Sequence, residues 1–338
     1  MKSESINGDI ALEQGTWVKL ICGASNQDLA SITDLCAIYA AAGVNCIDIA
    51  ADEAVAHAAQ KALDWVELNL GKKRPWLMVS VSDGKDVHFR KAYFDPEKCP
   101  ETCSRPCEKV CPANAIQQSE GVKKNLCYGC GRCLPICPLG IIEEKNQALP
   151  ISKFGSIISK IQPDAVEIHT APGRLEEFET SLISVLKSKV KLNRIAVSCG
   201  LYGHGIDEYS LANELWQRYE CLRKFNQKPI WQLDGRPMSG DIGKGTGKFA
   251  ISLWQKILPL APPGPLQLAG GTNSETITYL NNPKLPPAGV AFGGMARKII
   301  QPILVEAQQE NIKLIDWPEG WNRALEKACN LINPWLVK

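Results

Sequence analysis

The sequence predicts an α/β fold, a (β/α)8 TIM-like barrel with a small cysteine-rich domain inserted after its third strand. Two observations lead to this prediction. Eight short apolar segments alternate with segments of helical periodicity along the 338 residues, and eight of the fourteen cysteines lie between Cys99 and Cys137. Apolar strands joined by helical crossovers are typical of a parallel sheet that is buried on both faces. An open, doubly wound parallel sheet is the competing architecture for the same alternation.

Three strand–helix units precede the cysteine-rich segment. We expect their strands at residues 17–24, 45–51 and 76–82. Helical patterns cover the first two connections, at residues 28–42 and 54–70. Each pattern ends at a glycine, Gly43 or Gly71, and glycine is common just past the C-terminus of a helix.

Five further strands follow the cysteine-rich segment. We expect them at residues 164–170, 194–200, 230–235, 266–271 and 288–294. Helices are expected at residues 152–161, 175–188, 211–226, 249–258, 275–281 and 296–309. The predicted domain limits are 1–92 and 147–338 for the two parts of the barrel and 93–146 for the insertion. Because the active sites of such barrels lie at the C-terminal ends of the strands, the insertion would stand at the rim of that face.

The composition limits the classes of function. The net charge is +2, with both signs interspersed, which argues against a nucleic-acid partner. Apolar stretches are interrupted well before the roughly 20 residues that a membrane-spanning helix requires. The N-terminal segment lacks the apolar core of a secretory signal and is acidic for a transit peptide. We therefore expect a soluble, cytoplasmic protein, in which clustered cysteines are more often metal ligands than disulfides.

The cysteines form two consecutive motifs. The second, "CYGCGRCLPICP", has the C-x2-C-x2-C-x3-C-P spacing of bacterial iron–sulfur sites, whereas the first, "CPETCSRPCEKVCP", has the wider spacing C-x3-C-x3-C-x3-C-P. Residues 93–146 resemble bacterial two-cluster ferredoxins, in which the fourth cysteine of each motif binds the other cluster. That resemblance implies two [4Fe-4S] clusters, one on Cys99, Cys103, Cys107 and Cys137, the other on Cys127, Cys130, Cys133 and Cys111.

Alternatives to this cofactor assignment remain open. Because the first motif is a variant, its cluster could be [3Fe-4S], or the domain could hold a single cluster. Zinc also binds four cysteines, although its sites usually consist of two C-x2-C pairs separated by a longer loop. Gly129 and Gly131, within the second motif, would allow backbone N–H groups to approach a cluster closely.

The loops after the last three strands are rich in glycine. The segment 234–248, "DGRPMSGDIGKGTGK", is either a flexible surface loop or a lid that brings Arg236, Lys244 and Lys248 over an anionic ligand. After the seventh and eighth strands come "AGGTN" and "FGGMARK", at the usual phosphate site of such barrels. These segments predict an FMN or phosphorylated ligand near Gly270, Gly271, Thr272, Gly293 and Gly294. The alternative is that the glycines only form tight turns.

The sequence assigns no catalytic residue outside the cysteine motifs. His169 and His204 follow the fourth and fifth strands and would face the rim near Arg174 and Cys199. We expect both histidines to be hydrogen-bonded scaffold groups. The lack of an identifiable catalytic set favours a redox sensor, whereas the lid and the glycines typical of a phosphate site favour an enzyme.

The variant first motif, the regular second motif and the stretch "LDGRPMSGDIGKGTG" together resemble the light-dependent period (LdpA) family of cyanobacteria and its plastid relatives. The resemblance runs nearly end to end. It implies a redox-sensing iron–sulfur protein that adjusts the circadian period to light. It also implies clock proteins as partners, namely the input kinase CikA and the Kai proteins.

Two classes of function follow from these observations. The first is a redox sensor or electron-transfer protein, for which a redox partner or a quinone is expected. The second is a barrel oxidoreductase that binds a flavin or a phosphorylated ligand and receives electrons from its two clusters. A third interpretation, in which the clusters only stabilise the fold, is also open.

Overall fold

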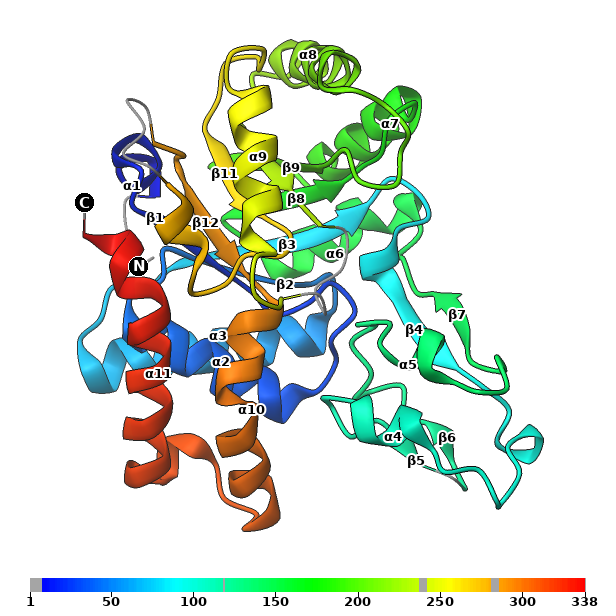
Figure 1. Cartoon of the computed structure of the whole chain (residues 1–338). Coiled ribbons are helices and arrows are strands. Elements are labelled where there is room, and N and C mark those ends of the chain that lie inside the picture. The colour runs from blue at the N-terminus through cyan, green and yellow to red at the C-terminus, as the bar shows by residue number, and fades with distance from the viewer. Residues whose placement is uncertain (1–7, 118, 237–241, 281–285, 338) are drawn as a thin grey trace.

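The computed structural model describes residues 8–117, 119–236, 242–280 and 286–337, and eight parallel strands close into a barrel at its centre (Figure 1). Each barrel strand pairs with the barrel strands that precede and follow it in the sequence, and the last pairs with the first. The strands are β1 (Trp17–Ile21), β2 (Cys46–Ala50), β3 (Trp76–Ser82), β8 (Ala165–His169), β9 (Arg194–Cys199), β10 (Pro229–Asp234), β11 (Leu266–Ala269) and β12 (Gly289–Phe292). The predicted (β/α)8 barrel is confirmed, and the open sheet is excluded because β1 pairs with β12.

Helices surround the barrel in the predicted order. They are α2 (Leu29–Ala42), α3 (Glu53–Leu70), α6 (Phe154–Ile161), α7 (Leu175–Leu186), α8 (Glu208–Lys224), α9 (Gly247–Ile257) and α10 (Gly294–Gln309), with a 3-10 turn at Ile151–Lys153 before α6. Asp52 begins α3 by accepting hydrogen bonds from the backbone N–H groups of Ala54 and Val55. Gly43 and Gly71 end α2 and α3 in the left-handed conformation, as their sequence positions predict.

The connection after β11 differs from the prediction. The segment expected as a helix at residues 275–281 forms only a 3-10 turn, η4 (Thr276–Tyr279), and Asn281 lies outside the described residues. β-branched residues at 276–278 and the prolines at 283, 286 and 287 leave little sequence suited to an α-helix there.

Two helices were not anticipated, and both cover the barrel. The short helix α1 (Gly8–Gln14) places Ala11 and Leu12 in an apolar cluster with Trp17 at the N-terminal end of the strands. Helix α11 (Pro318–Leu336) follows the 3-10 turn η5 (Leu314–Asp316) and packs against α2 and α10 (Figure 1). Among the described residues, no helix has the length and apolar character needed to cross a membrane.

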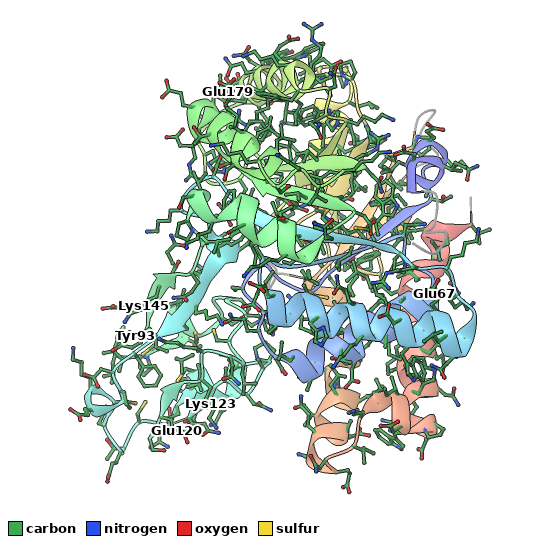
Figure 2. The ribbon with its side chains drawn as sticks, turned by 180° about the vertical axis from the view of Figure 1, so that it is seen from behind. Glu67, Tyr93, Glu120, Lys123, Lys145 and Glu179 are labelled. Atoms are coloured by element: carbon green, nitrogen blue, oxygen red, sulfur yellow. The ribbon has the colours of Figure 1, made fainter. Side chains whose placement is uncertain are left out.

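The inserted segment leaves the barrel after β3 and returns before α6. After a 3-10 turn, η1 (Val87–Phe89), strand β4 (Arg90–Tyr93) pairs in antiparallel fashion with β7 (Glu143–Asn146). Between these strands lie η2 (Pro96–Lys98), α4 (Pro106–Val110), β5 (Ile116–Gln117), β6 (Gly121–Val122) and α5 (Cys133–Ile136). A small core that includes Phe94 and Ile142 holds the segment together. Figure 2 shows the inserted segment from the opposite side to Figure 1.

A line of polar side chains crosses the barrel interior and positions the groups at its mouth. The Trp17 indole N–H donates to Gln267, whose amide donates to Gln232 Oε1 at 2.8 Å. The Gln232 amide in turn donates to Glu167 Oε1 at 2.7 Å. Because buried polar groups are costly unless paired, this network fixes the orientation of Glu167.

Candidate cluster sites and the mouth of the barrel

Four cysteines line one cavity in the inserted domain. They come from the end of α4, from the loop before α5 and from the first residue of α5, and they are Cys111, Cys127, Cys130 and Cys133. Apolar side chains, among them Ile116, Val122 and Leu134, complete the walls. This is the set of four that the resemblance to ferredoxins groups around the second cluster. The long sequence separation of Cys111 from the other three is bridged by the packing of α4 on α5.

The remaining four cysteines are linked to one another. Cys99, Cys107 and Cys137 belong to the small core around Phe94, which also includes Cys111 and Cys133. Electrostatic coupling also joins Cys99 to Cys103 and Cys137, and Cys107 to Cys137. Burial raises the pKa of the Cys99 and Cys107 thiols, and the neighbouring cysteines raise it further.

The cysteine sulfurs receive backbone hydrogen bonds of the kind that iron–sulfur ligands use. The Ala115 N–H donates to Cys111 Sγ at 3.2 Å. Burial acts to raise the pKa of Cys137, but backbone N–H groups that begin with those of Ile141 and Leu139 outweigh it and lower this pKa. Two sets of four cysteines with N–H donors aimed at sulfur fit iron–sulfur clusters, whose potentials depend on such hydrogen bonds.

Gly129 has a structural role in addition to the one suggested by the sequence. Its φ is +72°, and a Cβ at this position would lie 2.2 Å from the carbonyl oxygen of Arg90 on β4. The Arg90 side chain donates back to the Gly129 carbonyl at 3.3 Å and pairs with Glu144 on β7 at 2.6 Å. Glycine is therefore required here for close packing of the cysteine loop against β4.

A second cavity lies at the C-terminal ends of the barrel strands. It is lined by most of the residues predicted to bind a phosphorylated ligand, namely Arg236, Gly270, Gly271, Thr272, Gly293 and Gly294. Gly293 and Gly294 form the N-terminus of the 16-residue helix α10, whose first N–H groups lack a side-chain cap. Such a terminus favours an anion.

The cationic side chains of the predicted lid take different positions. Arg236 lines the cavity and stacks on the rings of Tyr202 and Phe249, at 5.0 and 4.7 Å. Lys244 and Lys248 are exposed and do not line it, and Lys248 lies over the ring of Tyr279. Residues 237–241 of the same loop lie outside the described residues.

Three charged side chains that the sequence analysis did not single out meet at the base of this cavity. Lys19 on β1 is fully buried, forms an ion pair with Glu167 on β8, and lies 4.0 Å from Asp48 on β2. Asp48 and Glu167 line the cavity, and Asp48 also accepts a hydrogen bond from Ser80. A signal for them exists in the sequence, because each is a charged residue in the middle of an apolar strand. Buried charges require partners.

The pKa values of these groups reflect the pairing. Burial disfavours the charged form of Lys19, but Glu167 and Asp48 outweigh it and raise the Lys19 pKa. Burial likewise acts to raise the pKa of Glu167, and Lys19 and His169 reverse this effect and lower it. Burial and the charge of Glu167 raise the pKa of Asp48. Asp48, a carboxylate of raised pKa that lines the cavity, can exchange a proton with a group bound there.

His169 lies at the mouth of the barrel, as the sequence suggested. It contacts Glu167 and a segment of the insertion, and Arg174 pairs with Asp83 at 3.2 Å. Burial acts to lower the pKa of His169, but Glu167 and then Asp86 raise it to about 9. His204 is exposed.

Tyr128 joins the two cavities. It lies between Cys127 and Cys130 in sequence, and together with Gly129 it contributes to the walls of both the cysteine cavity and the barrel-mouth cavity. Arg297 of α10 lies over its ring at 4.3 Å and donates to the carbonyl oxygens of Ile21 and Cys22 at 3.1 and 2.8 Å. The inserted domain therefore shares a wall with the barrel mouth.

Comparison with protein families and known proteins gives consistent matches over both parts of the chain. The model of the light dependent period A C-terminal domain matches residues 157–334, and the model of the LdpA Fe–S cluster-binding domain matches residues 99–148. The protein named light dependent period A of Synechococcus elongatus is 43% identical over 331 residues, which cover 96% of this chain and 92% of that protein.

Other similarities are partial or concern the overall fold. An uncharacterized ferredoxin of Methanocaldococcus jannaschii is 28% identical over 127 residues, 32% of this chain and 84% of that protein. The solved structure of the YdjI aldolase from Escherichia coli superimposes with a TM-score of 0.47 at 10% identity, covering 97% of this chain and 94% of that one.

Proposed function

Since this chain belongs to the light dependent period A family, and is an iron–sulfur protein of that type, we propose that it senses redox state through two [4Fe-4S] clusters. The observation that supports this proposal most directly is the grouping of Cys111 with Cys127, Cys130 and Cys133 around one cavity. When bound, the clusters supply reversible one-electron chemistry.

Each of the two cysteine sets would hold one cluster. One set is Cys111, Cys127, Cys130 and Cys133, and the other is Cys99, Cys103, Cys107 and Cys137. The shared wall at Tyr128 and Gly129 supports a route from the cysteine cavity to the barrel mouth. A change in the charge of the cluster in the cavity of Cys111 would therefore alter the electrostatic environment of Arg297, which stacks on Tyr128 and donates to the end of β1.

The biological output that we propose is adjustment of the circadian period to light-dependent redox state. A redox partner or a quinone would set the oxidation state of the clusters. The clock proteins CikA and Kai would receive the signal. The resemblance to the light dependent period A family supports this output.

Anaerobic isolation tests the cluster assignment. We expect brown protein with two clusters' worth of iron and acid-labile sulfide per chain, and an electron paramagnetic resonance signal that appears on reduction. Protein that binds stoichiometric zinc without sulfide would contradict the proposal. Iron and sulfide for a single cluster would limit it to one cysteine set.

A second candidate function is supported by the barrel-mouth cavity. Its glycines, the N-terminus of α10 and Arg236 together suit a phosphorylated ligand such as FMN. In this case the protein would be an oxidoreductase that receives electrons from its clusters. Acid extraction of anaerobically isolated protein, followed by mass analysis, should then release a flavin or a phosphorylated compound in an amount close to that of the chain.

A further inference from the structure

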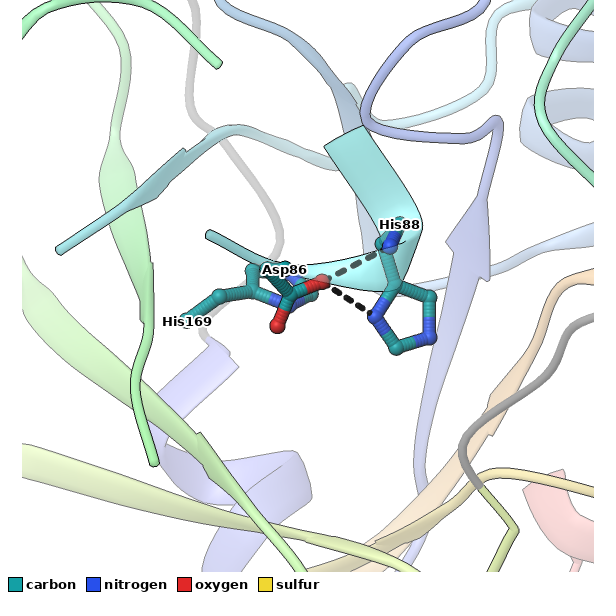
Figure 3. A group of neighbouring side chains, drawn as sticks. All are labelled: Asp86, His88 and His169. Atoms are coloured by element: carbon teal, nitrogen blue, oxygen red, sulfur yellow. Dashed lines mark hydrogen bonds and ion pairs between the residues drawn. The ribbon is translucent and has the colours of Figure 1, made fainter. Parts of the chain in front are cut away.

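Three side chains of metal-binding type meet at the rim of the barrel. Asp86 and His88 lie between β3 and β4, and His169 is the last residue of β8, so the group joins the insertion to the barrel (Figure 3). One ligand atom from each of the three lies within 4.8 Å of the others. Two imidazoles and one carboxylate are a donor set that divalent transition metals prefer.

One nitrogen of His169 has no hydrogen-bond partner among the described residues. The side chain of His169 is only 8% exposed, and its Nε2 lies 3.0 Å from Glu167 Oε1. The other nitrogen, Nδ1, is buried and unpaired, 3.9 Å from Asp86 Oδ2, which is too far for a hydrogen bond. With Nε2 directed at Glu167, Nδ1 is left facing the space beside Asp86, where a metal ion would take the place of its proton.

Glu167 occupies the position of a supporting carboxylate. Histidines that bind metals usually donate their second N–H to a carboxylate or carbonyl oxygen, which fixes the tautomer and the ring orientation. Glu167 is fully buried and is itself held by Lys19 and Gln232, so it cannot turn away from the ring. The Phe89 ring, 5.1 Å from that of His169, supports the ring from another side.

Asp86 and His88 are also held in place. The backbone N–H of His88 donates to Asp86 Oδ1 at 2.7 Å, and His88 Nδ1 lies 2.8 Å from the same oxygen. Two ligands of one ion with bonds of about 2.0–2.1 Å lie roughly 3 to 4 Å apart. The 3.9 Å between His169 Nδ1 and Asp86 Oδ2 falls in that range. The 2.8 Å between His88 Nδ1 and Asp86 Oδ1 is a hydrogen-bond distance just below it, and this pair would move slightly apart when an ion replaces the shared proton.

We propose that Asp86, His88 and His169 bind one divalent transition-metal ion, Zn²⁺ or Fe²⁺, at the mouth of the barrel. His88 and His169 both line the barrel-mouth cavity, so that the remaining coordination positions face it. Arg236 and the N-terminus of α10 line the same cavity. An oxygen atom of an anionic ligand held there would reach the metal. This site is separate from the eight cysteines of the two motifs.

Zinc binding to the cluster-loaded protein tests the proposal. Isothermal titration with ZnCl2 under anaerobic conditions should show one site per chain. Asp86→Asn and His88→Gln should each weaken the affinity by more than about 10-fold, because the first removes the carboxylate charge and the second removes an imidazole ligand. His204→Gln, which changes an exposed histidine that follows β9, should bind zinc like the unaltered protein.

X-ray absorption at the zinc edge identifies the ligands. Nitrogen and oxygen at about 2.0–2.1 Å are expected, whereas zinc on cysteines would give sulfur at about 2.3 Å. A sulfur shell, the absence of binding, or equal affinity in His88→Gln would each overturn the proposal. His88 is partly exposed, and the visible absorbance of the clusters checks that this variant remains folded. If Asp86→Asn fails to fold, the zinc affinity of His88→Gln and the X-ray absorption spectrum still test the proposal.

Discussion

At the scale of single residues, the grouping of the cysteines depends partly on their spacing in the sequence and partly on the fold. Within each motif the first three cysteines are close in sequence, and short spacing alone can place them around one cluster. The fourth member of each set comes from the other motif. Cys111 joins the cavity of Cys127, Cys130 and Cys133 because α4 and α5 pack against each other.

Exchange of single cysteines tests this crossed arrangement. In Cys137→Ser we expect half of the iron to be lost and iodoacetamide to modify Cys99, Cys103 and Cys107. In Cys130→Ser the modified residues should instead be Cys111, Cys127 and Cys133, because a cluster that loses a ligand exposes the remaining thiols. Mass spectrometry of peptides from anaerobically treated protein identifies the sites.

Cys329→Ser provides the control, since Cys329 lies on α11, outside both motifs. It should retain all iron. Modification of Cys127 and Cys133 in Cys137→Ser would show that each motif binds its own cluster.

At the scale of secondary-structure elements, the contact between β4 and the cysteine loop determines how the insertion is held. Gly129 approaches the backbone of Arg90 more closely than any side chain would permit. Arg90 then links this loop to Glu144 on β7. The short β4–β7 ribbon is thus both the support of the second motif and the connection to the barrel.

Gly129→Ala should therefore release the cluster on the second motif. The added methyl group would meet the Arg90 carbonyl oxygen, and the positive φ adds about 1 kcal/mol of strain. We expect the iron content to fall by about half.

Gly140→Ala separates the effect of the contact with Arg90 from the effect of backbone strain. Gly140 also has a positive φ, but a Cβ there has no neighbour within 4 Å. This variant should keep its iron. Equal loss of iron in both variants would mean that backbone strain, and not the contact with Arg90, is responsible.

At the scale of the whole molecule, Arg297 connects the insertion, β1 and α10. It is 3% exposed, stacks on Tyr128 and donates to two carbonyl oxygens at the end of β1. Arg297→Gln should cost about 2 kcal/mol, because buried carbonyl groups lose a charged donor. That loss should lower the thermal midpoint by about 3 °C in a chain of this size.

The same variant should bleach faster in air, since the wall of the cysteine cavity loses its support. Arg323→Gln is the matched control, because Arg323 pairs with Glu306 on the surface of α11 and α10. Surface pairs contribute little to stability, so that its midpoint should change by less than about 2 °C. Similar midpoints for the two variants would contradict a connecting role for Arg297.

The sequence by itself determined the order of eight strands, most of the helices and the two cysteine motifs, because these depend on local periodicity and spacing. It did not determine the helix α11, whose apolar face is explained only by its packing on α2 and α10. Charged residues within apolar strands, such as Lys19 and Glu167, were visible in the sequence but had no identifiable partners.

Only the tertiary structure decided which distant residues meet at the barrel mouth. Asp86 and His169 are 83 positions apart, and they face each other because the closed barrel places the loop after β3 beside the end of β8. Tyr128 reaches Arg297 for the same reason, since the insertion folds back over the rim. Barrel closure sets these distances, and no local sequence pattern encodes them.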